Sequence, residues 1–170
     1  LPDSRQGERN ALDVLRAMGV PMTHENNIVR VRGNGRLRAV EFDGDEFTDA
    51  VLACVAAAVF AEGTSRFYNV ENLRYKECDR ITDFLTELRK AGADVEEKRD
   101  EIIVHGKPEG VRGGAVIDAH YDHRVIMALT VVGLRSEEGV VIRDAHHVAK
   151  SYPQFFEHLT ALGAEIRLES

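Results

Sequence analysis

Three segments of this chain share one pattern, in which apolar residues at helical spacing are followed by a glycine. The glycines are Gly19, Gly92 and Gly163, which lie 73 and 71 residues apart. In each segment the residues eight, seven, four and one positions before the glycine are apolar. That spacing places apolar side chains on one face of an α-helix, and glycine is a common left-handed cap at a helix C-terminus. The pattern therefore predicts three copies of one structural unit.

A short stretch with strand character follows each of these helices. After the first helix we expect a hairpin of strands at 20–22 and 28–31, and after the second a hairpin at 94–96 and 102–104. The third helix is followed by alternating polar and apolar residues at 165–168, which predict a strand.

Two further helices are each headed by an aspartate. Asp49 precedes the apolar run 50–61 and Asp122 precedes 123–134, and the two aspartates are again 73 residues apart. An aspartate at this position can accept hydrogen bonds from the amides of the first turn, as a helix N-cap does. The strands expected after these helices are 65–70 and 140–143.

These elements predict an α/β fold of repeated units in the order strand, helix, strand, helix, strand, strand. Two units span about 36–106 and 115–168, and a partial first unit spans 7–31. We expect a single domain over 1–170, with the first half of the first unit upstream of Leu1, because the chain does not begin with methionine. The alternative is a generic α/β sandwich in which the repeat is a matter of chance.

Composition narrows the classes of function. Of the 170 residues, 22 are Lys or Arg and 29 are Asp or Glu, which gives a net charge of −7 without a dense basic stripe, so we expect no nucleic-acid partner. No apolar run approaches the ~20 residues of a membrane span, so we expect no membrane partner. Cys54 and Cys78 are too few for a disulfide framework, which favours a reducing, cytoplasmic location.

A cluster of charges precedes the second of the three glycine-ended helices. We expect Lys76 and Arg80 to share one face at the start of that helix, where two cations oppose each other and the helix dipole. An anion bound above them would remove this conflict, and a helix N-terminus already favours anions. The alternative is a solvated cluster neutralised by Glu77 and Asp79.

Two other motifs allow more than one interpretation. In the segment 120–124, Asp122 is a plausible N-cap. His120, Asp122 and His123 would also suit a metal, but no further ligand motif supports one, so we expect none. Asp49 either caps its helix or acts as a general base beside cations from the sister units.

If the units stack, five charged residues lie at helix N-termini and face one cleft. They are Asp49, Lys76, Arg80, Arg124 and Lys150. Four cations and one carboxylate suit a small polyanion that must lose a proton, such as a molecule that carries both phosphate and carboxylate groups. No glycine-rich phosphate loop is present, so ATP is not expected.

Four motifs stand in the order that one known family shows. They are Thr48-Asp49, the segment 72–80 with the pattern Asn-x-Arg-x-Lys-Glu-x-Asp-Arg, Asp122-His123-Arg124, and Ala149-Lys150-Ser151-Tyr152-Pro153. This set resembles the C-terminal motifs of the 5-enolpyruvylshikimate-3-phosphate synthase family, and the segment 4–7 resembles the start of the family's corresponding helix. The resemblance implies two lobes, each of three βαβαββ units packed as an inside-out α/β barrel. This chain resembles most of the C-terminal lobe.

The resemblance also implies a reaction and roles for individual residues. The carboxyvinyl group of phosphoenolpyruvate would move to the 5-hydroxyl of shikimate 3-phosphate, in the shikimate pathway towards chorismate, without a metal or cofactor. Asp49 is implied as the base near the attacking hydroxyl, and Lys76 and Glu77 as groups that move a proton at the methylene carbon. The implied substrate contacts are Asp49, Asn72 and Lys76 for shikimate 3-phosphate, and Arg80, Arg124 and Lys150 for phosphoenolpyruvate.

The family's N-terminal lobe is the implied partner, because it supplies the rest of the site. We therefore expect this chain alone to show little or no turnover. UDP-N-acetylglucosamine enolpyruvyl transferase shares the fold and the donor, but its pattern does not carry the Lys-Glu-x-Asp-Arg and Asp-His-Arg motifs in this form. The RNA 3′-phosphate cyclases would need nucleotide chemistry and a more basic surface. The remaining alternative is a non-catalytic anion-binding module.

Overall fold

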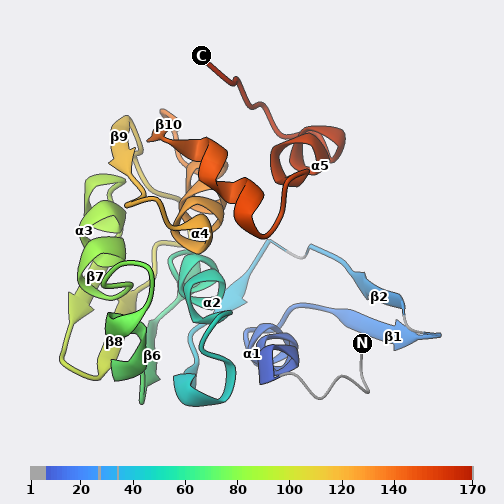
Figure 1. Cartoon of the computed structure of the whole chain (residues 1–170). Coiled ribbons are helices and arrows are strands. Elements are labelled where there is room, and N and C mark those ends of the chain that lie inside the picture. The colour runs from blue at the N-terminus through green and yellow to red at the C-terminus, as the bar shows by residue number, and fades with distance from the viewer. Residues whose placement is uncertain (1–6, 27, 34, 170) are drawn as a thin grey trace.

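A four-stranded mixed sheet with helices packed beside it forms the centre of the molecule (Figure 1). The computed structural model describes residues 7–26, 28–33 and 35–169, so the resemblance at 4–7 falls almost wholly outside the described residues. The α-helices are α1 (Ala11–Ala17), α2 (Val51–Ala58), α3 (Thr82–Lys90), α4 (His123–Gly133) and α5 (Phe155–Ala161). The strands are β1 (Met22–Glu25), β2 (Ile28–Val31), β3 (Leu37–Arg38), β4 (Glu41–Asp43), β5 (Ala61–Glu62), β6 (Thr64–Tyr68), β7 (Asp94–Glu97), β8 (Glu101–His105), β9 (Ala115–Asp118) and β10 (Val140–Arg143). Short 3₁₀ helices are η1 (Gly7–Asn10), η2 (Gly44–Phe47), η3 (Glu71–Tyr75) and η4 (Ala145–Lys150).

The main sheet buries one row of side chains from each of its central strands. Its strand order is β4, β6, β8, β7, with β6 parallel to β4 and antiparallel to β8. Phe67 on β6 and Ile102 and Val104 on β8 are fully buried, while their neighbours along the strands are more exposed. This alternation is what a strand with one buried face requires.

α2 is the most deeply buried helix of this core. Six of its eight residues are buried, and it packs against α1, α4 and β6 (Figure 1). A helix that is apolar on all sides belongs in an interior, which is what the run 50–61 predicted. The predicted C-terminal end was wrong, because the helix stops at Ala58 and Ala61–Glu62 form β5, parallel to β3.

Most of the locally predicted elements form. The three glycine-ended helices are α1, α3 and α5, and Gly19, Gly92 and Gly163 have the expected positive φ values of 91°, 95° and 97°. Both predicted hairpins are present, as β1–β2 and β7–β8. α4 and β10 also lie where they were expected. The predicted strand 65–70 instead ends at Tyr68, because Asn69 turns the chain with a left-handed φ of 57°.

The strand predicted at 165–168 does not form. Residues 164–169 follow α5 without forming a helix or strand, and Leu168 is 73% exposed. Alternating polarity cannot make a strand where the backbone has no neighbouring strand to pair with. The sheets of the described residues are one of four strands and three of two strands, and none of these closes on itself. The described part of the chain has no helix with the length and apolar character needed to cross a membrane.

Gly106, just after β8, marks a very close approach of two backbones. Its amide donates a hydrogen bond to the Gly63 carbonyl oxygen at 2.9 Å. A Cβ atom at this position would lie 1.8 Å from the carbonyl oxygen of Ala61 and 3.1 Å from that of Ala58. Both are backbone atoms, so they cannot rotate away as a flexible side chain could.

We expect Gly106→Ala to lower the free energy of unfolding by about 3 kcal/mol, at the upper end for overpacked cores, because backbone must move to admit the methyl group. Gly33→Ala is the matched control, since an added Cβ there meets nothing within 4 Å. We expect that control to stay within about 1 kcal/mol of the wild type. Urea denaturation followed by circular dichroism measures both, and equal stabilities for the two variants would contradict the close approach.

Candidate active site

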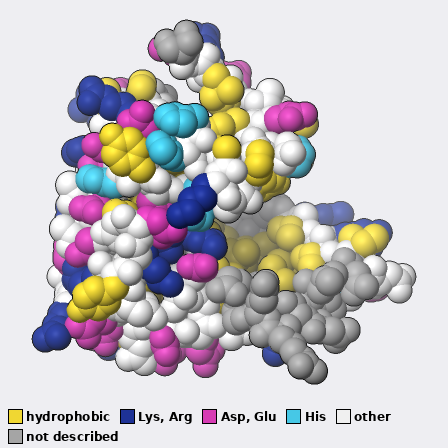
Figure 2. All heavy atoms as spheres, in the orientation of Figure 1, with side chains coloured by type: hydrophobic (Ala, Val, Ile, Leu, Met, Phe, Trp, Pro, Cys, Tyr) yellow, Lys and Arg dark blue, Asp and Glu magenta, His cyan; other side chains and the backbone are white. Residues whose placement is uncertain are grey.

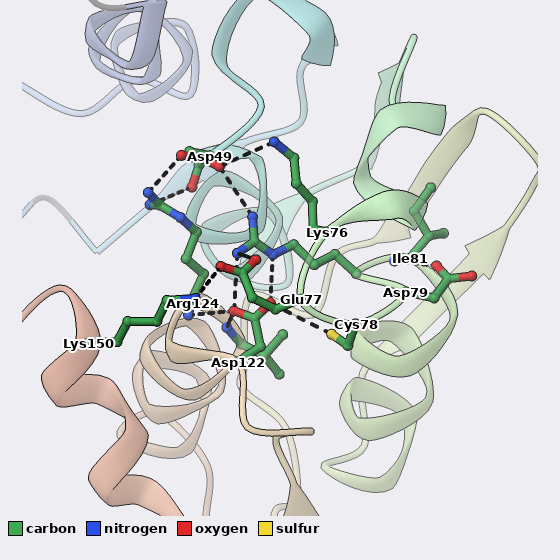
Figure 3. Close-up of polar contacts among 11 residues, drawn as sticks. Asp49, Lys76, Glu77, Cys78, Asp79, Ile81, Asp122, Arg124 and Lys150 are labelled. Atoms are coloured by element: carbon green, nitrogen blue, oxygen red, sulfur yellow. Dashed lines mark hydrogen bonds and ion pairs between the residues drawn. The ribbon is translucent and has the colours of Figure 1, made fainter.

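The guanidinium group of Arg80 joins carboxylates from three of the charged motifs, whose polar contacts Figure 3 shows. Its side chain is 1% exposed and contacts three carboxylates. Nε donates to Asp122 Oδ2 at 2.8 Å and Nη2 to Glu77 Oε2 at 2.7 Å. Nη1 donates to Asp49 Oδ1 at 3.2 Å. A buried cation of this kind is tolerated only when carboxylates surround it, so Arg80 draws three separate segments together.

Asp122 is the fully buried member of this cluster. Its Oδ1 accepts hydrogen bonds from the backbone amides of Arg124 at 2.8 Å and Val125 at 3.4 Å. The N-cap predicted for α4 is therefore confirmed. The same carboxylate also binds Arg80 through both oxygens. That second contact was not predicted, because the spacing identifies the helix cap and not a partner elsewhere in the chain.

The thiol of Cys78 donates to Asp122 Oδ2 at 3.7 Å. Burial, with the nearby Asp122 charge as a lesser cause, raises the pKa of Cys78 to about 12. Cys78 is therefore a neutral hydrogen-bond donor at neutral pH.

Asp49 uses its carboxylate on cations and does not cap α2. Its Oδ2 accepts from Arg124 Nη2 at 2.8 Å, and its backbone carbonyl accepts from Arg124 Nη1 at 2.9 Å. Lys76 Nζ lies 3.8 Å from Asp49 Oδ1. Among the described residues, no backbone amide donates to this carboxylate, and α2 begins only at Val51. Of the two interpretations of Asp49, the geometry favours a functional group over a helix cap.

Glu77 joins Arg80 to Lys150, which lies 73 residues further along the chain. Lys150 Nζ donates to Glu77 Oε1 at 2.8 Å from the end of η4. The hydrogen bond from Lys150 is the main cause that lowers the pKa of Glu77 to about 2, and the charge of Arg80 acts in the same direction. Glu77 is therefore ionised throughout the neutral range.

The structure thus gathers six of the seven predicted site residues into one network. They are Asp49, Lys76, Glu77, Arg80, Arg124 and Lys150. Asn72 is not joined to this network by any contact within the described residues. Its Nδ2 donates to Asp45 Oδ1 at 2.9 Å, and its buried Oδ1 finds no partner there.

The predicted placement of the cations at helix N-termini is wrong in detail. Lys76 and Arg80 do not share a helical face, because α3 begins only at Thr82 and Lys76 has an extended backbone. Asp79 sets this boundary, since its Oδ1 accepts from the amides of Ile81 and Thr82, both at 3.0 Å. Lys150 ends η4, five residues before α5 begins. Of the four cations, only Arg124 lies in the first turn of an α-helix.

The network is close to electrical balance. Lys76, Arg80, Arg124 and Lys150 face Asp49, Glu77 and Asp122, which leaves a formal charge of +1. In Figure 2, Lys and Arg side chains lie directly beside Asp and Glu side chains near the middle of the face in view. The prediction of four cations and one carboxylate left out Glu77 and Asp122, and so overestimated the net charge of this cluster.

His123 adds a neutral group beside this cluster. Burial lowers its pKa, and its buried Nδ1 has no hydrogen-bond partner among the described residues. No group of three His, Cys, Asp or Glu side chains within the described ranges is arranged to hold a metal ion.

Known proteins are similar to this chain over most of its length. Residues 1–159 match the family described as EPSP synthase (3-phosphoshikimate 1-carboxyvinyltransferase). The chain is 52% identical to 3-phosphoshikimate 1-carboxyvinyltransferase of Burkholderia pseudomallei, over 82% of this chain and 31% of that protein. It is 51% identical to the protein of the same name from Deinococcus radiodurans, over 94% of this chain and 36% of that protein. The chain thus spans about a third of the length of these relatives.

Solved structures agree on the fold. EPSP synthase from Acinetobacter baumannii aligns with a TM-score of 0.88 at 27% identity, over 96% of this chain and 41% of that chain. The enolpyruvyl transferase NikO from Streptomyces tendae aligns with a TM-score of 0.79 at 24% identity, over 94% of this chain and 36% of that chain. At that identity the second likeness concerns the fold alone.

Removing the Asp122 carboxylate should destabilise the protein strongly, because Arg80 would stay buried with a partner missing. We expect Asp122→Ala to cost about 3–5 kcal/mol of unfolding free energy, as breaking a buried ion pair does. Asp122→Asn keeps a good N-cap but loses the charge and one acceptor for Arg80, so it should cost less than Asp122→Ala. Chemical denaturation at neutral pH measures both variants. Wild-type stability in Asp122→Ala would contradict the central role of the Arg80–Asp122 pair.

The low pKa of Glu77 predicts an acid-dependent contribution to stability. Because the folded-state pKa of about 2 lies below the ordinary 4.5, ionised Glu77 stabilises the fold above about 4.5, and this contribution is lost as the pH falls towards 2. Stability should therefore fall less steeply across this window in Glu77→Gln than in the wild type. Urea denaturation at a series of pH values gives the two slopes, and identical slopes would contradict the contribution.

Proposed function

This chain belongs to the EPSP synthase family, and from that premise we propose that it forms one lobe of a 3-phosphoshikimate 1-carboxyvinyltransferase. The proposed reaction moves the carboxyvinyl group of phosphoenolpyruvate to the 5-hydroxyl of shikimate 3-phosphate and releases phosphate. The observation that carries the proposal is the charge network around Arg80, in which residues from 49 to 150 meet. A cluster of preorganised cations suits substrates and a leaving group that are all anionic.

Three proton movements accompany the proposed reaction. In the addition step, the 5-oxygen bonds to C2 of phosphoenolpyruvate as its proton passes to a base, and C3 gains a proton. In the elimination step, C3 loses a proton and the bond from C2 to the phosphate oxygen breaks. Asp49 is the proposed base for the hydroxyl, since its carboxylate is partly exposed at the surface of the network.

Lys76 and Glu77 are the proposed groups for the proton at C3. With a pKa of about 2, Glu77 is ionised near neutral pH and can accept a proton but does not carry one to donate. The ammonium group of Lys76 is therefore the proposed acid of the pair. This division of roles applies to the arrangement without substrate.

Different cations of the network are accessible to different degrees. Lys150 is 57% and Arg124 29% exposed, whereas Arg80 is buried. We infer that Arg124 and Lys150 meet the anionic groups of phosphoenolpyruvate first. Arg80 would reach them after Glu77 or Asp49 gives way. Asn72, which lies outside the network, is proposed with Asp49 and Lys76 as a contact for shikimate 3-phosphate.

The remainder of the enzyme is proposed to be a second lobe. Because the chain spans about a third of its relatives, we infer that a partner lobe from the same polypeptide completes the site. Each lobe would contain three βαβαββ units in the inside-out α/β arrangement, with this chain forming most of the C-terminal one as a single domain. Alone, it would bind anions with little or no turnover.

The test is phosphate release from phosphoenolpyruvate and shikimate 3-phosphate. We expect no turnover from this chain alone, and turnover from a fusion with the remaining sequence of a relative such as the Deinococcus radiodurans protein. In the fusion, Asp49→Ala and Lys76→Ala should each reduce turnover about 10²- to 10⁴-fold, as expected for loss of acid–base groups.

Asp94→Ala and Lys98→Ala are matched controls, because both residues are exposed in the β7–β8 hairpin, and they should leave turnover unchanged. A well-folded fusion without phosphate release would overturn the proposed reaction and favour an anion-binding module.

A further inference from the structure

Arg74 has a hydrogen-bond arrangement that the proposed reaction does not use. Its side chain is 18% exposed, and all five of its guanidinium N–H groups have acceptors. Nε donates to the Arg99 carbonyl at 2.9 Å, and Nη2 donates to the Lys98 carbonyl at 2.8 Å and to Glu97 Oε1 at 3.0 Å. These three acceptors lie at the turn of the β7–β8 hairpin, which belongs to the main sheet. Arg74 is therefore fixed to a rigid element.

The remaining nitrogen of Arg74 reaches forward along its own chain. Nη1 donates to Asp79 Oδ2 at 2.9 Å and to Thr82 Oγ1 at 3.0 Å. Asp79 in turn caps α3 through the amides of Ile81 and Thr82. One guanidinium group thus joins the end of η3, the start of α3 and the hairpin turn.

The segment between Arg74 and Asp79 carries charged residues of the network around Arg80. Between Arg74 and Asp79 lie Lys76 and Glu77, and Arg80 follows immediately. The residues from 76 to 81 belong to no helix or strand. The Arg80 amide makes one backbone hydrogen bond back to the Leu73 carbonyl, at 3.1 Å. The carbonyls of Asp79 and Ile81 also accept from the amides of Asp83 and Leu85. Between Lys76 and Cys78 the structure describes no backbone–backbone hydrogen bond, so side-chain contacts on either side contribute to the path of this part.

The charged side chains of the segment 74–80 therefore point in two different directions. Lys76, Glu77 and Arg80 point towards Asp49, Asp122 and Lys150, whereas Asp79 points away from them (Figure 3). Among the described residues Arg74 makes no hydrogen bond or ion pair with Asp49, Glu77 or Lys150, so it does not belong to the charge network itself.

We propose that Arg74 is a positioning residue of this site, which acts through Asp79 and the β7–β8 turn to hold Lys76, Glu77 and Arg80 in place. The planar fork of arginine is needed, because a lysine ammonium cannot span three separate acceptor groups. The inference rests on the proposed function only for the expected effect on turnover. The positioning of Glu77 by Arg74 can be tested without any substrate.

The test uses the ionisation of Glu77, which reports its distance from Arg80 and Lys150. His123 also faces Glu77 and is uncharged at neutral pH, because burial lowers its pKa, while Asp122 shares the Arg80 guanidinium group with Glu77. In the 170-residue chain labelled with ¹³C, we would follow the carboxyl shift of Glu77 between pH 7 and pH 4. In the wild type Glu77 should stay ionised at pH 4. In Arg74→Gln its pKa should rise from about 2 towards the ordinary 4.5.

Glu101 is the internal control. Its pKa is also about 2, first through Arg66 of β6, which binds Glu41 as well, and second through Lys98, whose carbonyl accepts from Arg74. Arg74→Gln should leave Glu101 ionised at pH 4. Arg66→Gln should raise the pKa of Glu101 and leave the pKa of Glu77 unchanged. A residue that merely added stability would move neither carboxyl group while the protein stays folded. An unchanged Glu77 in folded Arg74→Gln would overturn the proposal.

Two further variants keep the test decisive if Arg74→Gln does not fold. Arg74→Lys retains the charge and loses the fork, and Asp79→Asn retains a good helix cap and loses the ion pair. Both should raise the pKa of Glu77, and a low Glu77 pKa in both would overturn the proposal.

In the active fusion, Arg74→Lys should reduce turnover at least about tenfold, whereas Arg66→Lys should not. If the Glu77 shift appears but no fusion turns over, the positioning role stands and the proposed reaction fails.

Discussion

The burial of the Arg80 guanidinium group is the constraint on which the site depends. A cation taken out of water costs several kcal/mol unless carboxylates compensate for it, and here three do so. Asp122 also caps α4, while Asp49 lies just before α2. Satisfying one guanidinium group therefore fixes the starts of two helices relative to the segment before α3. Arg124 and Lys150 then complete the cluster through the outer oxygens of the same carboxylates.

Much of the fold could be predicted because its signals are local. The helices that end at Gly19, Gly92 and Gly163 are set by apolar spacing and by glycines with positive φ, which the chain carries in its own sequence. The strand expected at 165–168 had a comparable alternation but no pairing partner, so it did not form. A helix satisfies its own backbone, whereas a strand depends on residues elsewhere, and this difference accounts for which predictions were confirmed.

Most members of the charge network could be predicted, but Asp122 was not expected in it, Asn72 lies outside it, and the pairing of the charges could not be predicted. The motifs identified the residues that meet, because each lies at the edge of a predicted helix. The partner of each charge is set by contacts across long stretches of chain, such as Asp49 with Arg124, 75 residues apart. The assumed helical face of Lys76 and Arg80 was wrong because α3 begins only at Thr82, where Asp79 accepts hydrogen bonds from the first amides. The spacing of residues likewise could not show that Asp122 both caps α4 and binds Arg80.

All four cations of the network are already paired with carboxylates. In the proposed lobe, these pairs would affect the free energy of anion binding. An incoming phosphate or carboxylate does not meet four free cations. It meets a cluster with a formal charge of +1, in which Glu77 already holds Lys150 and Arg80. Binding is therefore an exchange of partners, and its free energy is the difference between two sets of ion pairs. The carboxylates that stabilise the cluster would therefore lower the affinity of the proposed lobe for an anionic ligand.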